Sequence, residues 1–185
     1  MATRIVLLRA VNVGGAKLPM ADLRAIAAEL GATEATTYIA SGNLIAEVPG
    51  DPDAFDRALE RTIEERFGFF REAISRTREE LITALAAHPF EVLVPKYSYV
   101  SFMMRAPDPE AVAAAADLPT GEDRWAVVGR ELHLRYADGA GRPQLKDAQL
   151  LRALGGIPTT ARNLNTVQKL IELAESGQAF VASGG

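Results

Sequence analysis

Residues 36–48 read TTYIASGNLIAEV, and this stretch decides the fold. Two runs of strand-forming residues, Thr36–Ala40 and Leu44–Val48, flank the triplet Ser41-Gly42-Asn43. Short apolar or β-branched runs joined by a glycine-containing turn are typical of an antiparallel hairpin. We therefore predict two adjacent strands here, and the sequence on either side is interpreted around them.

A helix is predicted on each side of this hairpin. Before it, Pro19 suits the first turn of a helix, and apolar residues recur at helical spacing until Gly31. After it, Asp51–Phe67 carries an aromatic or aliphatic residue at every fourth position, and Gly68 ends the pattern. Both segments therefore predict amphipathic helices that pack on the hairpin.

Two further strands complete the first half of the chain. Arg4–Arg9 is an apolar run that predicts a buried strand, and Glu72–Arg76 predicts a short one. Residues 1–77 therefore predict the order β-α-β-β-α-β. The same order is predicted again later: strands at Tyr99–Met104, Arg124–Val128, Glu131–Tyr136 and Ile157–Ala161, and helices at Pro109–Leu118 and Gln144–Leu154.

The expected fold class is α+β, with two ferredoxin-like β-α-β-β-α-β subdomains whose sheets are antiparallel or mixed. Extra helices are expected at the centre and at the C-terminus. The predicted parts are a first subdomain over 1–77, a helix and linker over 78–97, a second subdomain over 98–162, a C-terminal helix over 163–176 and a loose tail over 177–185.

Composition narrows the function classes. The 185 residues include no cysteine, which excludes disulfides, thiolate catalysis and cysteine-ligated metals and fits a cytoplasmic location. No apolar run reaches the ~18 residues that span a membrane, so no membrane partner is expected. The formal net charge of −4 disfavours general binding to nucleic acid.

Positive charge is concentrated in two segments. Residues 1–21 contain Arg4, Arg9 and Lys17 and no acidic residue, and residues 142–170 contain five cations against Asp147. If the two segments meet in the fold, they form one positive patch on an otherwise acidic protein. The alternative is that these cations are scattered over the surface.

The segment Thr160–Leu170 is expected to open the C-terminal helix, with Asn163 as its N-cap. Helical periodicity places Arg162, Asn165, Thr166 and Lys169 on one polar side. A helix N-terminus is positive, so added cations favour an anion site there. The alternative is a cap followed by an ordinary solvated face.

The loop Asn12–Lys17 follows the first strand and contains Gly14 and Gly15, which would let backbone N–H groups approach a ligand. It lacks the full spacing of a nucleotide-binding loop, so a tight connection between strand and helix is the alternative. Ser41 and Asn43 are interpreted mainly as hairpin residues, because no base is evident for a nucleophilic serine.

Other side chains give weaker signals. His88 and His133 lie far apart in sequence, and His133 alternates with leucines, which predicts the polar face of a strand and no metal site. Tyr97, Tyr99 and Phe102 could stack on nucleic-acid bases, although Phe102 is expected in the core. Trp125 is expected to be a core or interface anchor.

Several short motifs together resemble a bacterial domain-of-unknown-function family, number 1697. They are Val11-Asn12-Val13-Gly14-Gly15, Pro19-Met20, Leu23, Tyr38-Ile39-Ala40-Ser41-Gly42-Asn43, His88-Pro89-Phe90 and Arg162-Asn163-Leu164-Asn165-Thr166-Val167. The resemblance implies two ferredoxin-like subdomains. It implies no reaction, substrate or catalytic residue, because none is established for the family. The chain differs from the family pattern at Ala10, His88 and Leu164, where glycine, asparagine and an aromatic residue are usual.

The sequence thus predicts a cytoplasmic protein that binds a small phosphate- or carboxylate-bearing ligand, with no cofactor. The predicted site contains Arg9, Asn12, Gly14, Gly15, Lys17, Ser41, Asn43, Arg162, Asn163, Asn165, Thr166 and Lys169. A weak nucleic-acid-binding module and a structural homo-oligomer without ligand are the alternatives, and a homodimer is one such assembly. Whether the protein is an enzyme stays open, because no catalytic signature is present.

Overall fold

The structure is a computed structural model that describes residues 1–182 of the chain, with side chains to Glu175. The described residues form six α-helices and two four-stranded antiparallel sheets, which is an α+β architecture. They divide into two units: unit 1 contains 1–82 and 169–185, and unit 2 contains 83–168. The last three residues of the predicted tail, 183–185, lie outside the described part.

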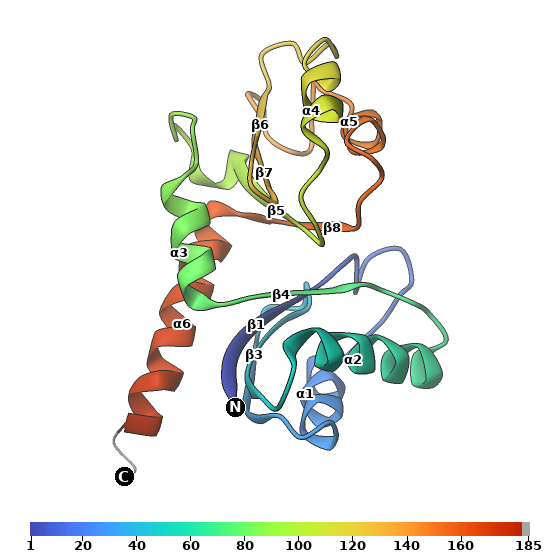
Figure 1. Cartoon of the computed structure of the whole chain (residues 1–185), viewed down its shortest axis with the longest axis vertical. Helices are drawn as coiled ribbons and strands as arrows, with labels where there is room; N and C mark the ends of the chain where they lie inside the picture. The colour runs from blue at the N-terminus through green and yellow to red at the C-terminus, as the bar shows by residue number, and fades with distance from the viewer. Residues whose placement is uncertain (183–185) are drawn as a thin grey trace. The chain divides into compact units, whose positions relative to one another are not determined.

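Unit 1 contains the predicted hairpin. Its sheet has the order β2-β3-β1-β4, with antiparallel neighbours throughout, and α1 and α2 pack together against one face (Figure 1). Tyr38 pairs with Asn43 across the turn, which confirms the hairpin. The elements are β1 (Ala2–Leu8), α1 (Met20–Glu29), β2 (Thr33–Tyr38), β3 (Asn43–Val48), α2 (Pro52–Phe67) and β4 (Ala73–Arg76).

The sequence patterns account for the core of unit 1. Every residue from Ile5 to Leu8 is fully buried, so both faces of β1 are covered and the apolar run is a buried strand. Phe55, Leu59 and Ile63 of α2 are buried at the predicted four-residue spacing. The carboxylate of Asp51 accepts the backbone N–H of Ala54 at the start of α2, and Gly68 ends the helix with a left-handed φ of 74°.

Two helices lie outside the β-α-β-β-α-β pattern. α3 spans Arg78–Ala86 and α6 spans Leu164–Ala182, so the C-terminal helix is longer than predicted. Within unit 1, the guanidinium of Arg78 donates to the carbonyl oxygen of Ile171 at 3.2 Å and pairs with Glu175 at 3.2 Å. These contacts attach the later part of α6 to the start of α3.

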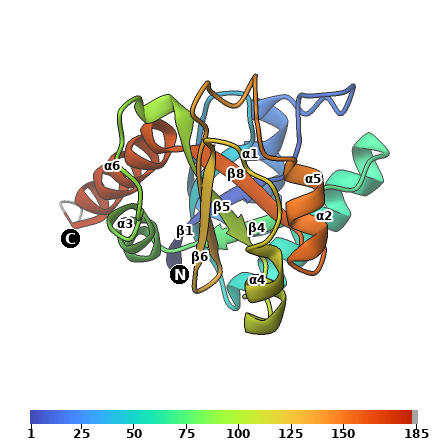
Figure 2. The ribbon, with the colours of Figure 1, turned by 90° about the horizontal axis from the view of Figure 1, so that it is seen from above.

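Unit 2 repeats the strand order of unit 1. Its sheet is β6-β7-β5-β8, antiparallel throughout, and α4 and α5 lie side by side (Figures 1 and 2). Met103, Leu132, Leu134 and Leu150 belong to its core. The elements are the 3-10 turn η1 (Pro95–Tyr97), β5 (Ser98–Met103), α4 (Pro109–Ala115), β6 (Arg124–Val128), β7 (Glu131–Arg135), α5 (Asp147–Ala153) and β8 (Thr159–Asn163).

Two expectations for unit 2 are wrong. β8 runs to Asn163, so Arg162 lies on a strand and not on the polar side of the C-terminal helix. His133 is fully buried and does not lie on a solvated face, because both faces of this sheet are covered at β7. Phe102 is fully buried, as predicted.

Candidate ligand-binding site

In unit 1, the side chain of Asn12 joins the segments that the sequence singled out. Its Nδ2 donates to the carbonyl oxygens of Leu18 at 2.9 Å and Ala40 at 2.6 Å, and its Oδ1 accepts the N–H of Leu18 at 2.8 Å. Asn12 has a φ of 57°, a left-handed conformation that asparagine tolerates. The amide of Asn12 therefore closes the loop on itself and attaches it to the hairpin turn.

The hairpin turn packs closely beneath this loop. A Cβ on Gly42, where φ is 83°, would lie 2.6 Å from a side-chain carbon of Val11 and 2.9 Å from one of Leu8. Asn43 is fully buried, and its Nδ2 donates to Tyr38 O and Ser41 Oγ, each at 2.9 Å. These contacts support the hairpin interpretation of Ser41 and Asn43, because both side chains serve the turn.

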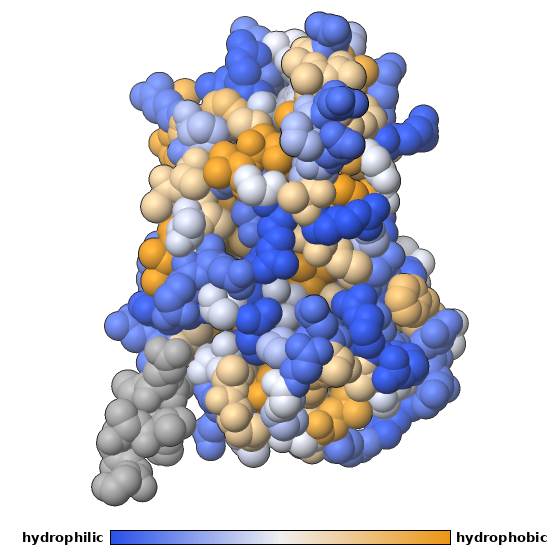
Figure 3. All heavy atoms as spheres, viewed as in Figure 1, coloured by the Kyte–Doolittle hydropathy of each residue, from blue (hydrophilic) through white to orange (hydrophobic). Residues whose placement is uncertain are grey.

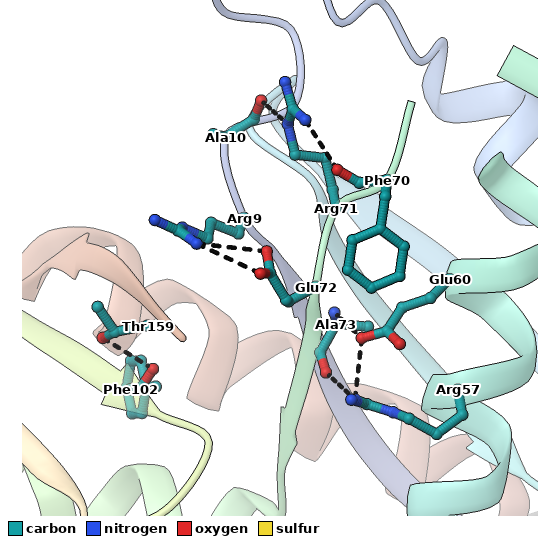
Figure 4. A network of polar contacts seen from close by, with 10 residues as sticks. All are labelled: Arg9, Ala10, Arg57, Glu60, Phe70, Arg71, Glu72, Ala73, Phe102 and Thr159. Carbon is teal, nitrogen blue, oxygen red and sulfur yellow. Dashed lines mark hydrogen bonds and ion pairs between the residues drawn. The ribbon is translucent and has the colours of Figure 1, made fainter. Parts of the chain in front are cut away.

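The other predicted residues at this loop are exposed. Gly14, Gly15 and Lys17 are exposed, and a Cβ on either glycine would meet nothing within 4 Å. Arg9 pairs with Glu72 at 3.3 Å, which partly neutralises its charge (Figure 4). Arg71 donates to the carbonyl oxygen of Ala10 at 3.2 Å.

Ala10 has a backbone conformation that favours glycine. Its φ of 49° lies in the left-handed region, where an added Cβ is strained and glycine is favoured. The Arg71 contact to its carbonyl oxygen fixes this strained peptide beside β4 (Figure 4). The glycine that the family resemblance leads us to expect at this position thus has a backbone explanation that needs no ligand.

The variant Asn12→Ala is expected to lower the free energy of unfolding of unit 1 by about 2 kcal/mol, because three hydrogen bonds are lost at a left-handed residue. Asn12→Gly removes the same bonds without the strain and should cost less. Urea denaturation followed by circular dichroism measures both. Lys17→Ala, an exposed change in the same loop, is the control, and an equal loss there would contradict the prediction.

In the C-terminal motif, the cap predicted at Asn163 is confirmed, whereas the position predicted for Arg162 is wrong. The Oδ1 of Asn163 accepts the N–H of Thr166 at 2.9 Å, which confirms the N-cap. Arg162 is buried, its guanidinium donates to Thr160 Oγ1 at 2.6 Å, and burial lowers its pKa to about 10. Thr166 is also buried, so only Asn165 and Lys169 of the expected polar side are exposed.

The predicted site residues are therefore divided between the two units. Unit 1 contains Lys169 and every site residue predicted between 9 and 43, whereas unit 2 contains Arg162, Asn163, Asn165 and Thr166. Within unit 1, Asn12, Ser41 and Asn43 lie around one loop and turn. A common patch of residues from both units stays a prediction.

Unit 2 contains an open hollow of about 610 Å³ that sequence reasoning did not assemble. Two tyrosine rings, two cations and a glycine-containing loop form its wall: Lys96, Tyr97, Tyr99, Asp138, Gly139, Ala140, Gly141, Arg142 and Asn163. The two cations outnumber the single carboxylate of Asp138. The sequence signal was present in Tyr97 and Tyr99 and in the glycine-containing loop, but their proximity depends on the fold.

Gly139 sets the position of this loop against Tyr97. A Cβ on Gly139, where φ is 87°, would lie 2.9 Å from the Tyr97 ring, so only glycine fits without displacement. The Nζ of Lys96 lies 5.6 Å from the centre of the same ring, within the range of a cation–π contact. Tyr97 thus contacts both the loop and a cation.

Asp123 also holds the same loop in place, and sequence reasoning did not identify this residue. The carboxylate is fully buried and accepts the N–H groups of Ala137 at 2.8 Å, Gln144 at 2.6 Å and Leu145 at 2.9 Å. An aspartate that accepts several backbone N–H groups fixes a loop much as a helix cap fixes a first turn. Its position just before a strand gave no such signal.

The two histidines, far apart in sequence, meet in unit 2. The Nδ1 atoms of His88 and His133 are 3.1 Å apart, so one ring donates and the other accepts, and the ring of Phe90 packs edge-on against His88. Both Nε2 atoms are buried without a hydrogen-bond partner. Burial lowers the pKa of both rings, that of His133 to about 4, helped by the nearby His88.

Nothing else in the described part of the chain adds metal ligands to this pair: no three His, Asp or Glu side chains gather into a group that could hold an ion. Over the same residues, no helix is long and apolar enough to cross a bilayer.

Comparison with known proteins gives the family. The model of the family described as "Protein of unknown function (DUF1697)" matches residues 1–133 of the chain. The chain belongs to this family. The DUF1697 match includes the Asn12 loop, the hairpin turn and both histidines. A search of curated proteins finds no match.

A solved structure resembles the DUF1697 chain over almost its whole length. It is conserved bacterial protein SP0830 from Streptococcus pneumoniae, which is 18% identical, with a TM-score of 0.71. The alignment covers 95% of this chain and 99% of the other. At this identity the likeness concerns the fold alone.

Proposed function

We propose that this DUF1697 protein binds a small phosphate- or carboxylate-bearing ligand at the open hollow of unit 2. One observation carries the proposal: Lys96 and Arg142 line the same hollow as the rings of Tyr97 and Tyr99. Arginine and lysine bind anionic oxygens, and tyrosine rings offer faces to a planar group. A ligand with an anionic group and a flat body, such as a mononucleotide, matches this wall.

Asn163 supports the proposal from the edge of the hollow. Its Oδ1 is occupied by the N–H of Thr166, so the side chain offers its Nδ2 hydrogens as donors. The loop residues Gly139, Ala140 and Gly141 have small or no side chains, which leaves room for a ligand at this wall of the hollow. The ligand class predicted from sequence is retained, with the cations Lys96 and Arg142 in place of the buried Arg162.

Weak binding to single-stranded nucleic acid is the second candidate, because Tyr97 and Tyr99 lie on η1 and β5 beside two cations. Stacking on aromatic rings next to a positive groove is how such modules bind without strict sequence preference. It predicts oligonucleotide affinity that falls steeply with salt. The cytoplasmic location and the homodimer stay predictions.

We also infer that each unit is ferredoxin-like. The order β-α-β-β-α-β, with the third strand between the first and second and the fourth on the other side of the first, supports this in both units.

Charge reversal tests the binding site. The variants Lys96→Glu and Arg142→Glu are each expected to weaken binding of adenosine monophosphate at least about tenfold, a loss of roughly 1.4 kcal/mol. Isothermal titration calorimetry on the full chain measures it. Arg105→Glu, an exposed residue of unit 2 outside the hollow, makes the same charge change as a control. If wild type binds neither the nucleotide nor ribose 5-phosphate, or if all three variants bind alike, the proposal fails.

A further inference from the structure

A second pair of cations in unit 2 lies on the hairpin of β6 and β7. Arg124 and Arg135 are direct partners in the antiparallel ladder, so their side chains leave the same face of the sheet. Like charges directly opposite each other are unfavourable in a sheet. The placement therefore calls for something that offsets two adjacent positive charges.

The protein itself offsets them only with carbonyl oxygens. Arg124 donates to Gly121 O at 2.9 Å and Asp123 O at 2.8 Å, and Arg135 donates to Glu122 O at 2.8 Å. Among the side chains that the structure describes, no carboxylate oxygen lies within 4.0 Å of either guanidinium. The Nε of Arg135 is buried and has no hydrogen-bond partner. Such a donor favours an acceptor that the chain does not supply.

Both arginines line a pocket of about 370 Å³. The rest of its wall is largely apolar or aromatic: Leu93, Val94, Tyr97, Tyr136 and Ala137, with Ser98 and Glu122. Leu93 is 72% exposed and Val94 38% exposed, although large aliphatic side chains usually lie inside. Figure 3 shows apolar side chains at the surface among hydrophilic ones. The pocket thus joins two cations to an exposed apolar wall, with one carboxylate, that of Glu122.

We propose that this pocket binds a small organic acid whose carboxylate or phosphate group contacts Arg124 and Arg135 and whose apolar body covers Leu93 and Val94. The planar guanidinium groups match the paired oxygens of such an anion. The volume lies within the range of small-molecule sites, roughly 300–1,000 Å³. The site uses other cations than the hollow of Lys96 and Arg142 and shares only Tyr97 with it.

The test separates the anionic group from the apolar body. Hexanoate and hexyl phosphate are titrated into the full chain, with acetate and hexanol as probes that each lack one part. At least one of the two acids is expected to bind saturably and about tenfold tighter than acetate or hexanol. The stronger acid shows whether carboxylate or phosphate is preferred. Failure of both acids to bind, or equal binding of hexanol, overturns the proposal.

Variants then assign the site. Arg124→Gln and Arg135→Gln are each expected to lower the affinity for the acid about tenfold or more, because each removes a charged hydrogen-bond donor. Arg105→Gln changes an exposed arginine that lines neither cavity, so it should leave the affinity unchanged. Arg124 is exposed, so its variant carries the test if Arg135→Gln does not fold. Unchanged affinity in Arg124→Gln overturns the assignment.

Discussion

The variant Asp123→Ala is expected to lower the free energy of unfolding of unit 2 by about 3–5 kcal/mol relative to the wild-type protein. The buried carboxylate of Asp123 accepts three backbone N–H groups between Ala137 and Leu145. Its removal leaves these donors without their acceptor, and hydrogen bonds to a charged group contribute more than neutral ones. The loop that they fix lines the pocket of Arg124 and Arg135 as well as the hollow of Lys96 and Arg142.

The single tryptophan makes this measurement specific. Trp125 lies on β6 of unit 2 and packs against its core, so its fluorescence during urea denaturation reports on unit 2. Asp108→Ala is the matched control, because the carboxylate of Asp108 accepts one N–H group, that of Glu110. That variant should lose about 1 kcal/mol, the usual value for a helix cap. Equal losses in the two variants would contradict the role given to Asp123.

Lowering the pH from 7 to about 4 is expected to destabilise unit 2 by about 3 kcal/mol through the paired histidines. The pKa of His133 is lowered to about 4 by burial and by His88, whereas an unfolded histidine titrates near 6.5. The unfolded chain therefore takes up a proton first as the pH falls. Stability is fully present above pH 6.5 and is lost progressively down to pH 4.

The chain has two histidines, so imidazole proton signals in a nuclear magnetic resonance titration belong to this pair. Both are expected to titrate below 6.5, with His133 the lower, because burial lowers the pKa of each ring. Titration of both rings near 6.5 would contradict the prediction. Denaturation of His133→Gln, followed through Trp125, gives the second measurement: its loss of stability between pH 7 and 4 should be smaller than that of wild type.

The order of helices and strands was predictable because each element has a local signal. The β2–β3 hairpin follows from Ser41-Gly42-Asn43, and α2 follows from Asp51, its apolar stripe and Gly68. Asn163 was also predictable as a cap. The error at Arg162 came from applying helical periodicity to a residue before the cap, where the chain still has the two-residue period of the strand.

The site was less predictable because it depends on which surfaces are covered. Alternation along β7 separates Leu132 and Leu134 from His133, but it does not say whether the second face is buried. Likewise, the pairing of Arg124 with Arg135 depends on the hairpin register. The role of Asp123 depends on N–H groups that lie 14 to 22 residues later in the chain. Such neighbours arise from tertiary structure, and local patterns contain little information about them.

The division of unit 1 into two segments has a consequence for biosynthesis. The ribosome releases residues 1–82 first, and 169–185 follow only after all of unit 2 has been made. The bond from Arg78 to the carbonyl oxygen of Ile171 therefore cannot form until all of unit 2 has been translated. At roughly 5–20 residues per second, the first segment waits several seconds for its last helix. Unit 2, a continuous segment, has all its residues before unit 1 does.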